Sequence, residues 1–145
     1  MKSLLLLATF ISLNTFAATC PSINGSFICQ RGTQFSFVDF TPKDTGYVVL
    51  TDGTLFEYFT DGKTYAVEGN EDMRDGKVRS YCEKNKFISD FTVTILDQGS
   101  PIAKQATKSE FSMEGVNLSI VHKIKMKGIP LPTLRFTCIP NSLVN

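Results

Sequence analysis

His122 is the only histidine in this 145-residue chain, and it lies in a segment where apolar and polar residues alternate. Ile120, His122 and Ile124 share one parity, which predicts that the imidazole points inward. A buried imidazole can orient a ligand or act as a base, but catalysis also needs a neighbouring nucleophile or carboxylate, and zinc needs further ligands. The simplest alternative is a structural histidine near a barrel mouth, bonded to a backbone carbonyl.

The four cysteines are the second group of chemically capable residues: Cys20, Cys29, Cys82 and Cys138. All of them follow an apolar leader, and an even number of cysteines in an exported chain predicts two disulfides. Three pairings are open, and we favour Cys20–Cys29 with Cys82–Cys138. Disulfide formation would consume the thiols, which argues against a cysteine nucleophile.

Lys123, Lys125 and Lys127 alternate with the inward residues, so we expect a basic strand face, with Arg135 in the next strand. Residues 101–145 contain six basic and two acidic side chains, whereas residues 39–97 contain seven basic and 12 acidic ones. Such a face could dock on an anionic glycan, a lipid headgroup or an acidic protein. Lysines on an exposed strand also simply keep it soluble, and that alternative stays open.

Other catalytic and metal-binding patterns are missing from the sequence. It contains no Gly-x-Ser-x-Gly, P-loop, Gly-x-Gly-x-x-Gly or Cys-x-x-Cys motif. Residues 70–76 gather three carboxylates, but Arg74 occupies a ligand position of a calcium loop. We therefore expect no catalytic residue, no metal and no cofactor, and a protein that is not an enzyme.

Residues 1–17 have the features of a secretory signal peptide, with cleavage after Ala17 or as late as residue 19. The apolar stretch LLLLATFISL is shorter than the roughly 20 residues that span a bilayer, and no later segment is long and apolar enough. Residues 18–145 are then one exported domain in the periplasm or outside the cell. Lipid attachment at Cys20 is disfavoured, because Thr19 precedes it and an odd number of cysteines would remain.

Loss of the leader removes Lys2, one of 15 basic residues, and leaves 14 basic side chains against 14 acidic ones. A net charge near zero argues against nucleic acid as a partner. A domain of this size can bury about two thirds of its unfolded surface, so it can hold its own core without relying on disulfides alone. We also expect a monomer.

Short runs of alternating apolar and polar residues predict an all-β protein with about eight or nine strands. The expected strands are 26–31, 34–40, 46–51, 54–60, 63–68, 77–83, 86–96, 103–113 with 116–127, and 133–139. Residues 103–113 could instead form a helical turn. Asp52-Gly53, Asp61-Gly62 and Asp75-Gly76 are hairpin signals, and the segment Gly-Ile-Pro-Leu-Pro at 128–132 predicts a loop or an edge.

A meander of this length predicts a closed or nearly closed up-and-down barrel, with a β-sandwich as the alternative. Closure would hide the edges of a sheet rich in phenylalanine, which supplies 12 residues and most of the expected core. The strand pattern resembles small exported barrels of the lipocalin and avidin type and the barrel-shaped lysozyme inhibitors. The likeness concerns architecture alone, since the Gly-x-Trp start of lipocalins is missing from a chain without tryptophan.

Two functions remain open. The first is a binding module for a small hydrophobic molecule or an envelope component, and the residues expected to line its interior are Phe35, Phe37, Phe91, Val93, Ile120, His122 and Phe136. The second is an interaction or inhibitor protein that acts on a secreted or envelope protein through a loop or the face at 123–127.

Overall fold

The computed structural model describes residues 19–143, so the expected signal peptide lies outside the described residues. Strands dominate the described chain, and one short 3-10 helix, η1, follows the last of them. The elements are β1 (Gly25–Arg31), β2 (Gln34–Lys43), β3 (Gly46–Thr51), β4 (Thr54–Phe59), β5 (Thr64–Val67), β6 (Met73–Glu83), β7 (Lys86–Asp97), β8 (Ser100–Glu114), β9 (Asn117–Met126), β10 (Ile129–Pro130), β11 (Leu134–Pro140) and η1 (Asn141–Leu143).

All strands belong to one antiparallel sheet that curls into a half-barrel, so the predicted barrel-like meander is confirmed. The order across the sheet is β4-β3-β2-β1-β11-β9-β8-β7-β6-β5, and β10 pairs with β9 beside this path. The first and last long strands, β1 and β11, are therefore neighbours. The open seam lies instead between β4 and β5, which are consecutive in the chain.

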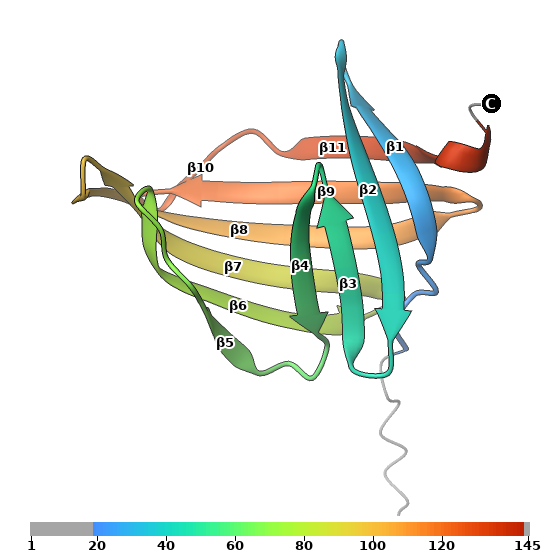
Figure 1. Ribbon diagram of the computed structural model, residues 1–145, viewed down its shortest axis with the longest axis horizontal. Helices are drawn as coiled ribbons and strands as arrows, with labels where there is room; N and C mark the ends of the chain where they lie inside the picture. Colours follow the sequence, from blue (N-terminus) through green and yellow to red (C-terminus); the bar gives the residue numbers. More distant parts are fainter. Residues whose placement is uncertain (1–18, 144–145) are drawn as a thin grey trace, which may run out of the picture.

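The two parts of the sheet cross each other, with β2, β3 and β4 running across β6, β7 and β8 (Figure 1). Their facing sides meet in an aromatic core. The ring centroids of Phe40 and Phe111 lie 5.6 Å apart, those of Tyr47 and Phe87 4.8 Å, and those of Phe87 and Phe111 5.1 Å. We call this side of the sheet its inner face and the opposite side its outer face.

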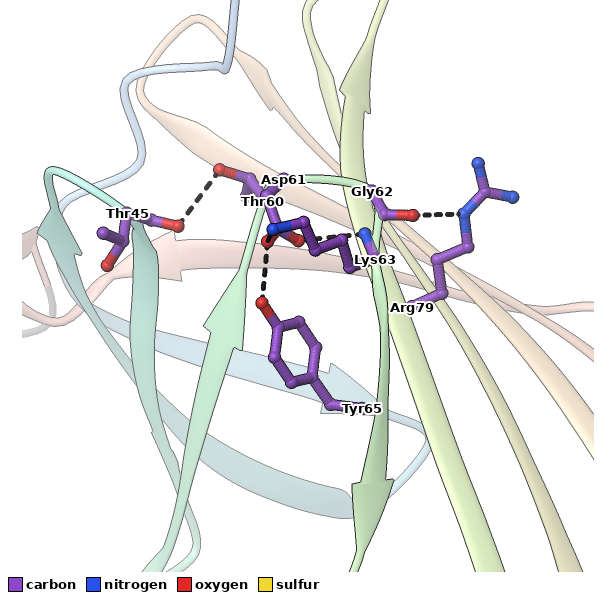
Figure 2. Close-up of polar contacts among 7 residues, drawn as sticks. All are labelled: Thr45, Thr60, Asp61, Gly62, Lys63, Tyr65 and Arg79. Carbon is purple, nitrogen blue, oxygen red and sulfur yellow. Dashed lines mark hydrogen bonds and ion pairs between the residues drawn. The ribbon is translucent and has the colours of Figure 1, made fainter.

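The connection from β4 to β5 carries the chain from one part of the sheet to the other (Figure 2). The carboxylate of Asp61 accepts hydrogen bonds from the backbone N–H of Lys63, at 2.9 Å, and from the Tyr65 hydroxyl, at 2.7 Å. Both bonds lower the pKa of Asp61, the tyrosine bond most. Arg79 Nε in β6 donates to the carbonyl oxygen of Gly62 at 2.8 Å. These bonds fix the connection at the seam.

The expected disulfide pairing is wrong. The bonds join Cys20 to Cys82 and Cys29 to Cys138. Cys29 and Cys138 are directly opposed in the paired strands β1 and β11, a pairing that sequence separation could not indicate. The other bond ties the segment before β1 to the end of β6, so that it links the two crossing parts of the sheet.

Only one of the three Asp-Gly pairs makes the predicted hairpin turn. Asp52 and Gly53 both have positive φ, as a type I′ turn requires, and join β3 to β4. Asp61-Gly62 lies in the connection between β4 and β5, and Asp75 lies at a bulge inside β6. Asp-Gly occurs in a hairpin turn, in a connection and at a bulge because aspartate and glycine both tolerate the positive φ found in each of them.

Strand positions agree with the alternation of the sequence. Residues 103–113 lie within β8, so the helical alternative is excluded, and β6 starts at Met73 because the bulge prolongs it. The proline-containing segment forms β10, a two-residue edge paired with β9 alone.

Candidate functional site

A small cavity of about 190 Å³ lies between the crossing parts of the sheet, near the aromatic core. Its walls come from strands β1, β2, β3, β4, β8, β9 and β11. The lining residues are Cys29, Ser36, Val38, Val49, Thr51, Phe56, Tyr58, Ser109, Phe111, Ile120, His122 and Phe136. None of them is a carboxylate or a lysine, so the cavity is apolar with a few hydroxyl groups and one imidazole.

His122 lies on the inner face of β9 and lines this cavity. Its Nδ1 is 2.8 Å from the Ser109 hydroxyl of β8, which replaces the backbone carbonyl expected as its partner. The rings of Phe111 and Phe136 contact the imidazole edge-on, at centroid distances of 6.3 and 5.7 Å. Burial lowers the pKa of His122, so the ring is neutral at pH 7.

The predicted ligand-lining residues divide between three places. Ile120, His122 and Phe136 line the cavity, whereas Phe91 and Val93 lie farther along the inner face of β7 and are not part of it. Phe35 and Phe37 are on the outer face of β2, with 61% and 55% of their surface exposed, so their assignment is wrong.

The error on β2 is one of parity. Val38 and Phe40 form the buried side of this strand, and both are opposite in parity to Phe35 and Phe37. Both faces of the strand carry phenylalanine, and alternation alone cannot say which set of side chains meets the core.

The outer face of β6–β9 gathers basic residues that are distant in sequence. Directly paired residues of neighbouring strands project on the same side of a sheet. One row consists of Lys77, Thr92, Ala106 and Lys125, and the next of Arg79, Asp90, Lys108 and Lys123. Beside the first row, Lys104 pairs with Thr94. We call the six residues Lys77, Arg79, Lys104, Lys108, Lys123 and Lys125 the outer basic surface.

The predicted basic face at 123–127 is thus part of a wider surface. Lys123 and Lys125 belong to it, while Lys127 lies in the turn after β9 with a φ of 52°. Arg135 of β11 pairs with Val121, one row beyond Lys123. The basic residues of β6 and β8 join this surface because of the strand register, which the sequence alone does not give.

Ion pairs with an acidic residue form at one margin of the outer basic surface. Glu110 accepts from Lys123 Nζ at 2.6 Å and from Lys86 Nζ at 3.1 Å. The bond from Lys123, followed by that from Lys86, lowers the pKa of Glu110 against the opposing effect of burial. Burial lowers the pKa of Lys108, but Tyr81 and the Asp90 and Glu110 carboxylates outweigh it, so the net pKa is raised and the ammonium stays charged.

The other lysines of the surface are not balanced in this way. Among residues 19–143, no carboxylate lies within 4.0 Å of the ammonium groups of Lys77, Lys104 and Lys125. These three line an open groove of about 730 Å³, whose wall also includes Asp75 and whose floor includes Thr92 and Ala106. Small floor residues between long cationic side chains leave room for an anionic group.

Sequence reasoning missed Ser109 and the lysines outside 123–127. Lys104 and Lys108 do show the even parity of the outer face of β8. Their segment was expected to be a strand, but its alignment with β6 and β9 was not known.

No family model, curated protein or solved structure matches this chain. No helix among the described residues is long and apolar enough to cross a membrane.

Proposed function

We propose that this protein is an exported binding module, in the periplasm or outside the cell, that docks through its outer basic surface onto an anionic component of its surroundings. The observation behind this proposal is the row structure of β6–β9. Six basic side chains share one face of the sheet, where the neighbouring acids are Asp90 in the second row, Glu110 at one margin and Asp75 in the wall of the groove. We further propose that the protein works by binding and not by catalysis.

Electrostatics favours such a role for a chain whose total charge is small. Clustering of cations on one face creates a local positive potential that a net charge of +1 conceals. Acids such as Asp39 in β2, Asp44 in the turn after it and Glu57 in β4 lie instead in the other part of the sheet. The resulting charge asymmetry would orient the outer basic surface toward a negatively charged partner during approach.

The inner cavity gives weaker support to the alternative of a small hydrophobic ligand. Its 190 Å³ is below the roughly 300 Å³ at which ligand pockets commonly begin. Catalysis by the Ser109–His122 pair is also poorly supported, because the cavity lining provides no carboxylate to orient the imidazole.

The test is retention on phosphocellulose, a generic polyanion, as a function of salt. We expect the triple variant Lys77→Glu, Lys104→Glu and Lys125→Glu to elute at much lower salt than the unaltered protein. The control is Arg31→Glu, Lys43→Glu and Lys84→Glu, which changes the total charge equally but lies outside the outer basic surface. It should elute close to the unaltered protein.

Thermal unfolding of both triple variants verifies that they are folded. Equal losses of retention in the two variants would show that total charge, and not this surface, governs binding, and the proposal would then be abandoned.

A further inference from the structure

One end of the long strands exposes three large apolar side chains. Ile129 of β10 is 66% exposed, Leu131, just after β10, is 43% exposed, and Ile102 of β8 is 51% exposed. Isolated apolar residues are common on protein surfaces, but a group of them at one end of a sheet marks a contact site.

These side chains are held in place by backbone bonds. Ile129 pairs with Met126 across the turn after β9, and Leu131 N–H donates to the carbonyl oxygen of Ile124 at 2.8 Å. Ile102 lines a shallow hollow together with Lys127 of the same turn. The apolar group is therefore a preformed feature of this end of the sheet. We call Ile102, Ile129 and Leu131 the apolar tip.

Three lysines lie near the apolar tip. Lys104 and Lys127 line the hollow beside Ile102. Lys125 pairs with Pro130 in β10, so it projects on the opposite side of this edge from Ile129, which pairs with Met126. Two acids lie in the same region: Asp97 in the turn between β7 and β8, and Asp75, which lines the groove with Lys104 and Lys125. Lys104 and Lys125 also belong to the outer basic surface, so that surface reaches this end of the sheet.

Resting on the proposed function, we infer that its anionic partner is a lipid bilayer, met by this end of the sheet. The apolar tip enters the boundary between headgroups and acyl chains, and Lys104, Lys125 and Lys127 contact lipid phosphates. Peripheral membrane proteins combine the same two interactions: insertion of apolar side chains to a depth of roughly 5–10 Å, and attraction of basic side chains to anionic headgroups.

A bilayer fits this combination better than a polyanionic glycan or an acidic protein surface. A glycan would satisfy the lysines but would leave Ile129 and Leu131 in water. An acidic protein surface offers carboxylates. These would pair with the lysines but would make no favourable contact with the apolar side chains of Ile129 and Leu131. The apolar tip and the three neighbouring lysines together match the layered polarity of an anionic leaflet.

The chain contains no tryptophan, so one introduced indole reports on a single place. We would measure fluorescence of Leu131→Trp with vesicles of phosphatidylglycerol and phosphatidylcholine, and with vesicles of phosphatidylcholine alone. The expected result is a blue shift, and quenching by brominated acyl chains, with the anionic vesicles only. Val116→Trp is the matched control, because Val116 is also an exposed apolar residue, at 63%, in the turn at the other end of β8 and β9. Its emission should not change.

A second measurement separates insertion from charge. In vesicle co-sedimentation, Ile129→Ser with Leu131→Ser should weaken binding by at least about tenfold. The same variant should keep its retention on phosphocellulose, because it leaves every lysine in place. Lys104→Glu with Lys125→Glu should weaken both, by roughly fivefold or more per lysine on vesicles at low salt.

The outcomes distinguish this inference from the proposed function. Vesicle binding without a spectral shift at position 131, or retention on phosphocellulose without vesicle binding, would overturn membrane insertion and leave the proposed function standing. If the unaltered protein is not retained on phosphocellulose, both the proposed function and the membrane inference would be refuted.

Discussion

Cys29 and Cys138 are directly opposed in β1 and β11, with their Cα atoms 4.0 Å apart, and their disulfide joins two strands from opposite ends of the chain. Together with the ladder between β1 and β11, this bond keeps these two strands in the middle of the sheet. The half-barrel consequently opens at β4 and β5, where no disulfide crosses the seam.

The first prediction concerns this pairing. Chymotryptic cleavage after Phe27 separates Cys20 from Cys29, so non-reducing peptide mapping should find Cys20 linked to Cys82 and Cys29 linked to Cys138. Replacing Cys29 and Cys138 by alanine should lower the free energy of unfolding by about 2–5 kcal/mol, because the bond closes a loop across most of the chain. A peptide containing Cys20 linked to Cys29 would contradict the structure.

The second prediction compares the two faces of β2. Phe40 is 1% exposed and contacts Phe111, so Phe40→Ala should cost about 3–5 kcal/mol of stability in urea denaturation. Phe37 lies on the outer face of the same strand, and Phe37→Ala should change stability by about 0.5 kcal/mol or less. Similar losses for the two variants would mean that the strand is turned the other way.

The third prediction is a pH dependence caused by His122. Since burial lowers its pKa in the folded protein, the unfolded chain binds the proton more readily. Stability should therefore fall as the pH drops below the unfolded value of about 6.5 and toward the folded pKa. As the only histidine, His122 gives a single imidazole signal for titration by nuclear magnetic resonance. His122→Gln should remove this part of the pH dependence, and a folded pKa above 6.5 would refute the argument.

The fourth prediction is a gain of binding from Glu110→Gln. The substitution frees Lys86 and Lys123 from their ion pairs and makes the outer basic surface more positive. Elution from phosphocellulose should require more salt, while stability should fall by less than about 1 kcal/mol because both lysines are half exposed.

The lowered pKa of Glu110 also sets the pH range in which its ion pairs stabilise the folded protein. Its pKa is lowered by the two lysines, so the stabilisation is present above the unfolded pKa and disappears as the pH falls through the folded one. Earlier elution of Glu110→Gln would argue against the outer basic surface as the binding site.

Several features of the protein follow from the sequence alone. Alternation of apolar and polar residues is a local property, and it predicted the strands, the inward parity of His122 and the strand character of 103–113. The turns at Lys84-Asn85 and Gly115 could likewise be predicted, because positive φ depends on the residues of the turn themselves.

Only the tertiary structure decided what depends on register and strand order. Sequence separation favoured Cys20–Cys29, but the pairing of β1 with β11 brings Cys29 to Cys138. Both faces of β2 carry phenylalanine, so which face is buried was decided by the strands that cross it. Lys77, Lys108 and Lys123 form one surface because three ladders align them, and ladder register depends on how distant segments pack, which a single stretch of sequence does not record.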